Sequence, residues 1–165
     1  IRAEHISGMT NIQADWLSRS TVDQAEWQLH LNLFREAVQR FGLPTVDLFT
    51  SPQNTQLPRF ISRYPSPGVE NVNAFRCKWP RGLLYAFPPL PLIPQVIHKM
   101  LIEKAELILV TPYWPRRPWF ADLKGLSIEE LWRIPEHKIR LSQGPIIHPD
   151  PQWLQLAIWK LRGDV

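Results

Sequence analysis

Apolar residues recur along the chain in blocks whose spacing switches between that of helices and that of strands. The first clear block has helical spacing, at Leu33, Phe34, Ala37, Val38 and Phe41. Gly42 is expected to cap this helix, and Pro44 prevents its continuation. Apolar strands are predicted at 45–49, 83–87 and 107–110, with a helix at 92–101 between the last two. Because strands alternate with helices, we expect an α/β fold with a Rossmann-like, mostly parallel sheet and helices on both faces.

The remaining regions are assigned from turn and capping signals. Residues 50–80 are rich in Ser, Asn, Pro and Arg and are expected to form a long loop. Ser127 and Glu130 have the spacing of a capping box, which predicts a helix start before Leu131. A final helix is predicted from Asp150 and Pro151, with an apolar face at Trp153, Leu154, Ala157, Ile158 and Leu161. We therefore expect a strand–turn–helix unit at 1–20, an α/β module at 21–125 and a C-terminal helical extension at 126–165.

Composition narrows the class of protein. The chain has 165 residues, which suits one ordinary domain, and no run of about 18 apolar residues predicts a membrane span. The lone Cys77 excludes an intrachain disulfide and a multi-cysteine zinc site, which fits an intracellular location, nuclear or cytoplasmic. The five histidines have no metal-ligand spacing, so no metal site is predicted. The first residue is Ile1 rather than Met, so we expect a fragment of a longer polypeptide.

Cations and aromatic residues gather in the predicted loops. Arg116 and Arg117 lie among Tyr113, Trp114 and Trp119, a pattern that suits phosphate contacts and base stacking on single-stranded nucleic acid. Weaker candidates for backbone contacts are Arg59, Arg63 and Lys78. The alternative is a proline-rigid loop whose tryptophans cover the end of the sheet, with the arginines as a solvated surface. The sequence supports both interpretations equally for the loop at 112–120.

The strand at 83–87 runs directly into Pro88 and Pro89, followed by Leu90 and a predicted helix. In α/β proteins ligands bind where parallel strands end, so this strand end is a candidate site. Asp47 is a further candidate, either as a ligand-binding acid at a strand end or as an acid that forms a turn.

The segment around Asp15 resembles the end of the RNase H domain of retroelement reverse transcriptases. The matching residues are His5-Ile6-Ser7-Gly8 and then Ala14-Asp15-Trp16-Leu17-Ser18-Arg19. The resemblance implies that Asp15 is the last of the acids that hold two Mg²⁺ ions for phosphodiester cleavage. The other acids of that site would lie upstream of Ile1, so Asp15 is expected to be inert here, a helix carboxylate or cap.

The chain from Glu26 to about Leu123 resembles the methyltransferase-like module that follows RNase H in DIRS-type retrotransposons, which carry a tyrosine recombinase. That module is similar to phage-type DNA adenine methyltransferases. The matching positions are Glu26-Trp27, Phe41-Gly42, Asp47, Asn73-Ala74-Phe75, Trp79, Pro88-Pro89 and Pro112. The resemblance implies a flipped adenine, a polar side chain before the two prolines that accepts its amine protons, and an aromatic ring after them.

The chain departs from that pattern at the chemistry itself. Phe87 has no side-chain acceptor, and Leu90 has no aromatic ring to stack on a base. The resemblance gives Asp47 as a possible contact of S-adenosylmethionine, but no glycine-rich cofactor loop is visible.

Three functions follow from these residues. The first is a non-catalytic module that binds DNA or an RNA/DNA hybrid within a retroelement polyprotein and needs no cofactor. The second is an active DNA adenine methyltransferase that uses S-adenosylmethionine. The third is a structural spacer between the reverse transcriptase and recombinase regions, and its partner is the rest of the polyprotein. We rank the methyltransferase below the other two because of Phe87 and Leu90.

Overall fold

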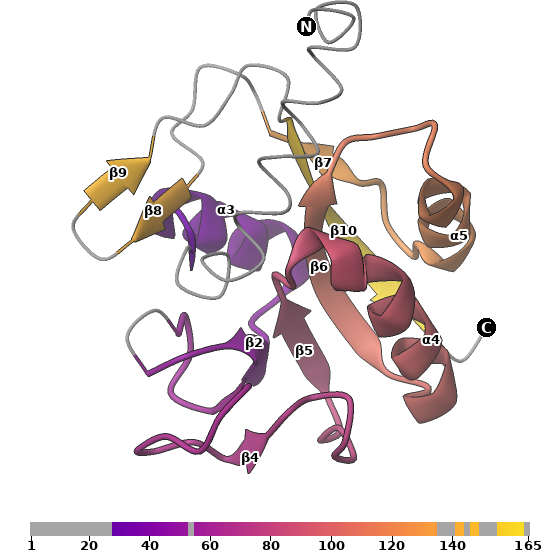
Figure 1. The fold of residues 1–165 in the computed structure, drawn as a ribbon. Helices are drawn as coiled ribbons and strands as arrows, with labels where there is room; N and C mark the ends of the chain where they lie inside the picture. The colour runs from indigo at the N-terminus through magenta and orange to yellow at the C-terminus, as the bar shows by residue number, and fades with distance from the viewer. Residues whose placement is uncertain (1–27, 53–54, 135–140, 144–145, 149–154, 164–165) are drawn as a thin grey trace, which may run out of the picture.

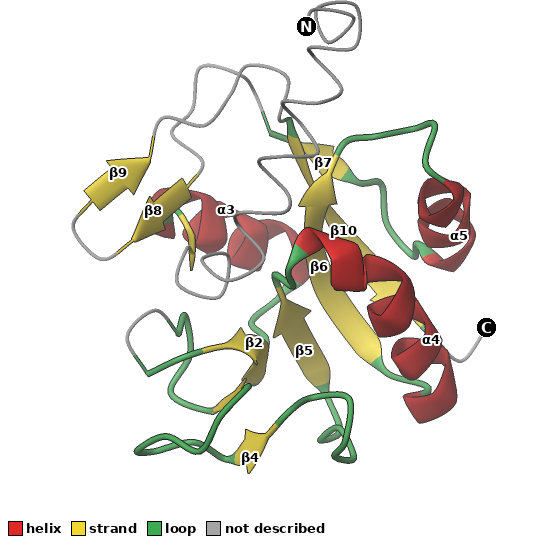
Figure 2. Cartoon of the chain, in the orientation of Figure 1, coloured by secondary structure: helices red, strands yellow, loops and turns green. Residues whose placement is uncertain are grey.

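The computed structural model describes residues 28–52, 55–134, 141–143, 146–148 and 155–163. These residues form a seven-stranded sheet with three α-helices and a separate three-stranded sheet (Figures 1 and 2). The helices are α3 (Leu31–Phe41), α4 (Ile93–Glu103) and α5 (Pro118–Leu126), with a short 3₁₀ turn, η1, at Leu90–Leu92. The large sheet contains β2 (Val46–Thr50), β3 (Phe60–Ser62), β4 (Asn71–Val72), β5 (Leu83–Ala86), β6 (Glu106–Pro112), β7 (Trp132–Arg133) and β10 (Leu156–Arg162). The small sheet contains β1 (Gln28–Leu29), β8 (Leu141–Gln143) and β9 (Ile146–His148).

The large sheet has the strand order β4-β3-β2-β5-β6-β10-β7. The strands from β4 to β6 are parallel to one another, and β10 is antiparallel to both of its neighbours. The chain leaves β2 toward β3 and β4 but leaves β5 in the opposite direction, toward β6. Strand order therefore reverses between β2 and β5, which is the position where open α/β sheets bind ligands. The predicted α/β class and mostly parallel sheet are confirmed.

Side chains alternate along the central strands between two apolar clusters. Leu84 and Leu107 pack with α4 and α5, whereas Tyr85 and Ile108 pack with α3. The first cluster includes Trp159 of β10, whose side chain is fully buried. Figure 1 shows α4 lying across β6. This alternation follows from the two-residue period of a strand and explains why β5, β6 and β10 are apolar at nearly every position.

The predicted helix from Asp150 to Leu161 is wrong in its described part. Leu156–Arg162 forms β10, which pairs along its whole length with β6, from Leu156 opposite Pro112 to Arg162 opposite Glu106. A strand inserted between two others is apolar on both faces, so its continuous apolar run imitates a buried helix face. The described residues of the predicted C-terminal helical extension, apart from the end of α5, thus contribute strands.

Three further assignments are corrected. The predicted loop at 50–80 contains β3 and β4, strands of three and two residues that are too short to show a period. The loop predicted at 112–120 ends at Pro118, where α5 begins with proline in its first turn. Ser127 follows the end of α5 as its C-cap and does not start a helix.

Candidate functional site

Pro88 and Pro89 follow the carboxyl end of β5, next to the point where the strand order of the sheet reverses. Pro88, Pro89 and Leu90 are buried, and the Leu92 N–H donates to the Pro89 carbonyl oxygen over 2.9 Å. This turn forms η1 and leads directly into α4, which has Pro94 in its first turn. The predicted strand, double proline and helix are therefore all present as one rigid connection.

Phe87 and Leu90 flank the prolines as packing residues. Phe87 is half-buried against the α3 cluster, and Leu90 lies in the α4 cluster with 8% of its surface exposed. The resemblance would require an amide or carboxylate at Phe87 and an aromatic ring at Leu90. Both side chains instead stabilise the turn through apolar burial, so the turn holds its shape without a polar group for chemistry.

A first hollow of about 280 Å³, the switch-point hollow, lies on one side of this turn. Its walls come from the ends of β2, β3 and β5, and include Phe49, Ser62, Arg63, Asn73, Phe75 and Pro89. The rings of Phe49 and Phe75 lie 5.3 Å apart. Asn73 is left-handed (φ 62°), and its side-chain oxygen accepts the Phe75 N–H over 3.0 Å, which fixes the turn that carries Phe75.

A second hollow of about 460 Å³, the Trp114 hollow, lies on the other side of the turn, between α4 and α5. Its walls include Leu90, Ile97, Trp114, Arg117, Trp119 and Asp122. The Arg117 guanidinium lies 4.9 Å from the centre of the Trp114 ring. The backbone N–H of Arg117 donates to the Trp114 carbonyl oxygen. This stacked pair holds a cation and an aromatic face together at the mouth of the hollow.

The other residues predicted in this loop divide between packing and exposure. Arg116 and Arg117 are exposed, and Trp114 is half-buried. Tyr113 packs edge to face on Phe120 at 5.3 Å and lies under the Arg133 guanidinium at 4.4 Å. Trp119 is only 9% exposed, so its ring mainly covers the core, as the structural alternative for this loop predicted. The base-stacking role predicted for Trp119 is therefore not supported.

Asp47 does not lie at a strand end. It is the second residue of β2, is 2% exposed, and is absent from the walls of the switch-point hollow. Its Oδ2 accepts the Gln56 N–H over 3.0 Å, while Oδ1 has no partner among the described residues. Burial raises the pKa of Asp47 to about 7, against the lowering effect of hydrogen bonds from the backbone of Gln56 and Phe49.

Tyr85 is the partner of Asp47 across β2 and β5, and its buried hydroxyl also has no hydrogen-bond partner among the described residues. Burial, and then the charge of Asp47, raise the pKa of this phenol. Two buried polar atoms without partners are costly in a core. The sequence does not indicate the unpaired Tyr85 hydroxyl, because Tyr85 has the pattern of an apolar strand residue.

The weaker predicted cations do not form one surface. Arg59 makes two hydrogen bonds to the Glu70 carboxylate, at 2.7 and 2.9 Å, so its charge is already balanced. Arg63 is exposed beside the switch-point hollow and lies over the Tyr64 ring. Lys78 lies at the opposite edge of the sheet, where β5 and β6 begin. Asp15 lies outside the described residues, as does the whole predicted unit at 1–20.

The walls of the switch-point hollow offer S-adenosylmethionine neutral acceptors, among them Thr50, Ser62, Asn73 and Gln95, but no acid. That cofactor has a sulfonium cation, an ammonium group and a ribose diol, which acids or other acceptors normally hold. The hollow contains no acidic residue, and its one charged residue is the cation Arg63. Among the described residues, no group of three or more His, Cys, Asp or Glu side chains could hold a metal ion.

A scan of the chain against protein-family models gives no match. A search of curated proteins also gives none. No helix in the described part of the chain combines the length and apolar character needed to cross a bilayer.

Proposed function

We propose that this chain is a nucleic-acid-binding module with a methyltransferase-like fold that binds single strands without catalysing methyl transfer. The observation that supports this most is the Trp114 hollow at the carboxyl edge of the sheet, where exposed Arg117 adjoins a half-buried tryptophan and exposed Arg116 precedes it in the chain. A base can stack on an aromatic face while guanidinium groups neutralise the flanking phosphates. Its source as part of a DIRS-type retroelement polyprotein rests on the sequence resemblance.

Strand order supports the methyltransferase-like part of this proposal. Numbered within the large sheet alone, the strands run third, second, first, fourth, fifth, seventh, sixth, and the seventh is antiparallel. This is the doubly wound order with one added antiparallel strand, which agrees with the Rossmann-like fold that the sequence resemblance implies. A fold hosts many functions, so it supports the ancestry of the module more than its activity.

Binding is tested by fluorescence anisotropy with a labelled single-stranded oligonucleotide over a series of salt concentrations. Changing Arg116→Gln together with Arg117→Gln should weaken binding and reduce the salt slope by about 1.4, because each lost phosphate contact on a single strand removes about 0.7. Trp114→Ala should weaken binding by about 1–3 kcal/mol with the salt slope unchanged. A wild-type chain with no affinity even at low salt would refute the proposal.

The active methyltransferase remains a second candidate because the strand order and the Pro88-Pro89 turn are both in place. Calorimetry with S-adenosylmethionine separates the two functions. We expect no binding heat at millimolar cofactor, since the switch-point hollow lacks an acid. Saturable heat, together with methyl transfer to DNA adenine, would reverse the ranking of the two candidates.

A further inference from the structure

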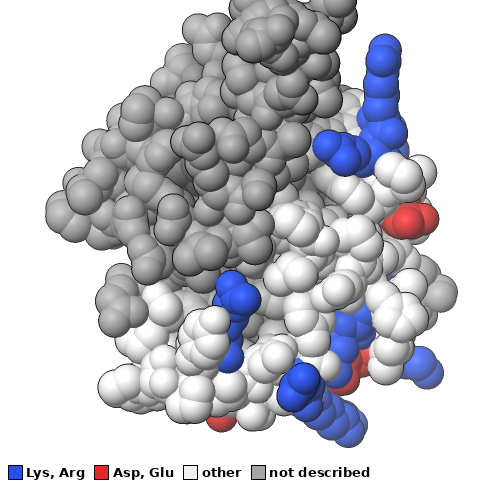
Figure 3. Space-filling model, in the orientation of Figure 1, with Lys and Arg blue, Asp and Glu red and all other residues white. Residues whose placement is uncertain are grey.

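A large basic cleft lies at the amino edge of the sheet, opposite to the two hollows. It has a volume of about 800 Å³ and lies between the loop before β5 and the end of α4. Its cations are Arg76, Lys78, Arg81, Lys99, Lys104 and Arg162, and its acids are Glu103 and Glu106. Figure 3 shows Lys and Arg side chains around the end of α4 and the loop before β5, apart from those near α5.

The cleft holds the charge excess of the whole chain. The chain has 19 Lys and Arg against 15 Asp and Glu, a net charge of +4. Six of those cations and two of those acids line the cleft, which leaves thirteen of each elsewhere. A concave surface that concentrates one sign of charge raises the local concentration of oppositely charged ligands.

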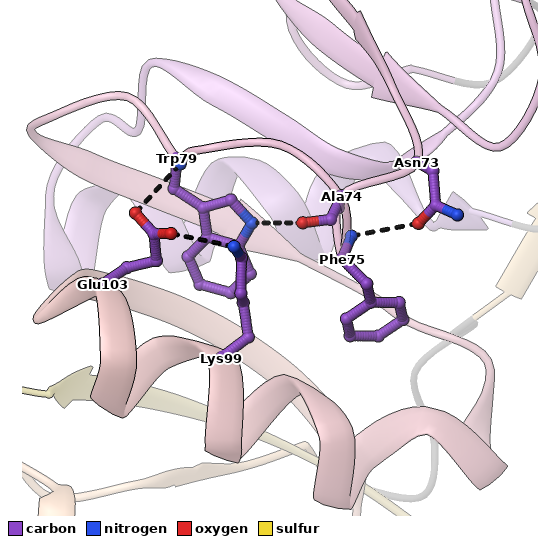
Figure 4. Close-up of polar contacts among 6 residues, drawn as sticks. All are labelled: Asn73, Ala74, Phe75, Trp79, Lys99 and Glu103. Atoms are coloured by element: carbon purple, nitrogen blue, oxygen red, sulfur yellow. Dashed lines mark hydrogen bonds and ion pairs between the residues drawn. The ribbon is translucent and has the colours of Figure 1, made fainter.

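The negative charge of Glu103, one of the two acids of the cleft, is already balanced by Lys99 (Figure 4). Glu103 accepts the Trp79 backbone N–H at 3.1 Å and pairs with Lys99 at 2.8 Å. Burial alone would raise the pKa of Glu103, but these hydrogen bonds, with the charges of Lys99 and Lys78, hold it below its usual value. The carboxylate therefore stays charged and occupies Lys99, while Arg76, Lys78, Arg81 and Lys104 stay exposed.

The loop that carries three of these cations is held in place through Trp79. The Trp79 ring is buried and donates its indole N–H to the Ala74 carbonyl oxygen at 2.8 Å (Figure 4). Its backbone is held by Glu103 of α4, as above. Arg76, Lys78 and Arg81 thus project from a rigid segment, which lowers the entropy that a ligand must remove on binding.

We propose that this amino-edge cleft is a second nucleic-acid site, which holds phosphates of the strand that the Trp114 hollow binds. The inference rests on the proposed function, and it adds a site at the edge of the sheet that α/β folds seldom use for ligands. Phosphates suit the cleft because four of its cations, Arg76, Lys78, Arg81 and Lys104, are exposed close to one another on its walls. The cleft thus supplies electrostatic attraction, and the Trp114 hollow supplies base contacts.

Three double variants, each removing two positive charges, test the cleft against the hollow. They are Lys78→Gln with Arg81→Gln in the cleft, Arg116→Gln with Arg117→Gln at the hollow, and Arg35→Gln with Lys124→Gln as the control. The probes are a labelled 20-nucleotide single strand and a glutamate peptide of equal charge, measured by anisotropy across salt. Urea unfolding checks that each variant folds as the wild type does.

We expect the cleft variant to reduce the salt slope for DNA by about 1.4 and the control to leave it unchanged. Glu103→Gln should increase the affinity, because it removes the negative charge and frees Lys99 while an oxygen remains for the Trp79 N–H. A merely structural role of Glu103 would not produce tighter binding.

The possible failures are distinct. No DNA binding by the wild type overturns both proposals. Loss in the hollow variant alone overturns the cleft and leaves the proposed function standing. Loss in the cleft variant alone removes the hollow from the binding surface, and so overturns a strand shared between the two sites. Equal affinity for the glutamate peptide overturns nucleic acid as the ligand of the cleft.

Discussion

The two edges of the large sheet differ in how they use their side chains. At the carboxyl edge, Phe87, Leu90 and Trp119 are packed into the core, and the turn at the switch point has no polar side chain for chemistry. At the amino edge, the loop before β5 and the end of α4 form a wide cleft with an excess of cations. The fold points to the first edge as a ligand site, whereas the charge distribution points to the second. An architecture and the electrostatics built on it can thus favour different surfaces of one protein.

The carboxyl edge depends on one buried tryptophan. The Trp159 indole N–H donates to Thr111 Oγ1 over 2.9 Å, and its ring packs edge to face on Phe120 at 5.1 Å. Trp159→Ala should destabilise the protein by about 3–5 kcal/mol in urea unfolding, because it leaves a large cavity between β6 and α5. Leu43→Ala, at a side chain 68% exposed, is the control and should change little. A loss below about 1 kcal/mol would show that this edge is not built on Trp159.

Asp47 and Glu103 are two acids with opposite environments, and this predicts opposite pH behaviour for their regions. Burial raises the pKa of Asp47 to about 7 from its ordinary value of 3.8. The folded protein therefore binds the Asp47 proton more tightly than the unfolded chain does. The stability that this proton provides is lost as pH rises from about 4 to 7. The loss can reach about 4 kcal/mol at 1.36 kcal/mol per pKa unit.

Asp47→Asn should remove this pH dependence, since an amide cannot titrate, and should equal or exceed the wild type in stability above pH 7. Urea unfolding at several pH values between 4 and 8 measures it. Glu103→Gln is the contrast: the lowered pKa of Glu103 means that its contribution is present above its unfolded pKa and is lost only at more acidic pH. If the free energy of unfolding changes with pH in the same way in the wild type and in Asp47→Asn, the Asp47 carboxyl is not buried and unpaired.

Gly163 lies where β10 ends against the last turn of α4, beside the cleft. A Cβ at this position would lie 2.4 Å from the Met100 carbonyl oxygen. Because that oxygen is backbone, Gly163→Ala should force α4 and β10 apart and cost about 1–3 kcal/mol. Gly125→Ala has no atom within 4 Å of the new Cβ and serves as the control. Unchanged thermal stability of Gly163→Ala would show that the end of α4 moves freely.

The smallest effect is expected at Arg59, which the sequence suggested as a phosphate contact. Its pair with Glu70 is half-exposed and screened by water, so Arg59→Gln should change the stability of the fold little in urea unfolding. Since the guanidinium is already bound to a carboxylate, DNA affinity should stay within error of the wild type. If Arg59→Gln lowers the salt slope as the double variant of Arg116 and Arg117 does, then Arg59 is part of the binding surface.

The sequence predicted the framework of the fold better than its edges. Long apolar blocks correctly gave α3, β2, β5, α4 and β6, because burial imposes a clear period on them. β3 and β4 were missed since two or three residues show no period. The pattern predicts a helix where β10 lies, because a strand buried on both faces is apolar throughout.

The candidate site was predicted in part. The Pro88-Pro89 turn and the exposed Arg116 and Arg117 lie where the sequence indicated. The periodic residues Trp119, Phe120, Leu123 and Leu126, after Pro118, could have revealed α5 and the burial of Trp119. The basic cleft joins residues 75–82 to residues 99–106 and Arg162, so only the folded chain brings its charges together.

The position of β10 has a consequence for how the chain is made. Among the described residues, β7 joins the large sheet through β10 alone, and the edge of β6 that faces away from β5 pairs with no strand other than β10. Some 44 residues separate Pro112 of β6 from Leu156 of β10, which a ribosome adds in about 2–9 s. Until β10 is in place, β6 lacks its partner on this side, and an apolar strand edge without a partner is a template on which chains aggregate. Synthesis is therefore a stage at which this fold is open to aggregation.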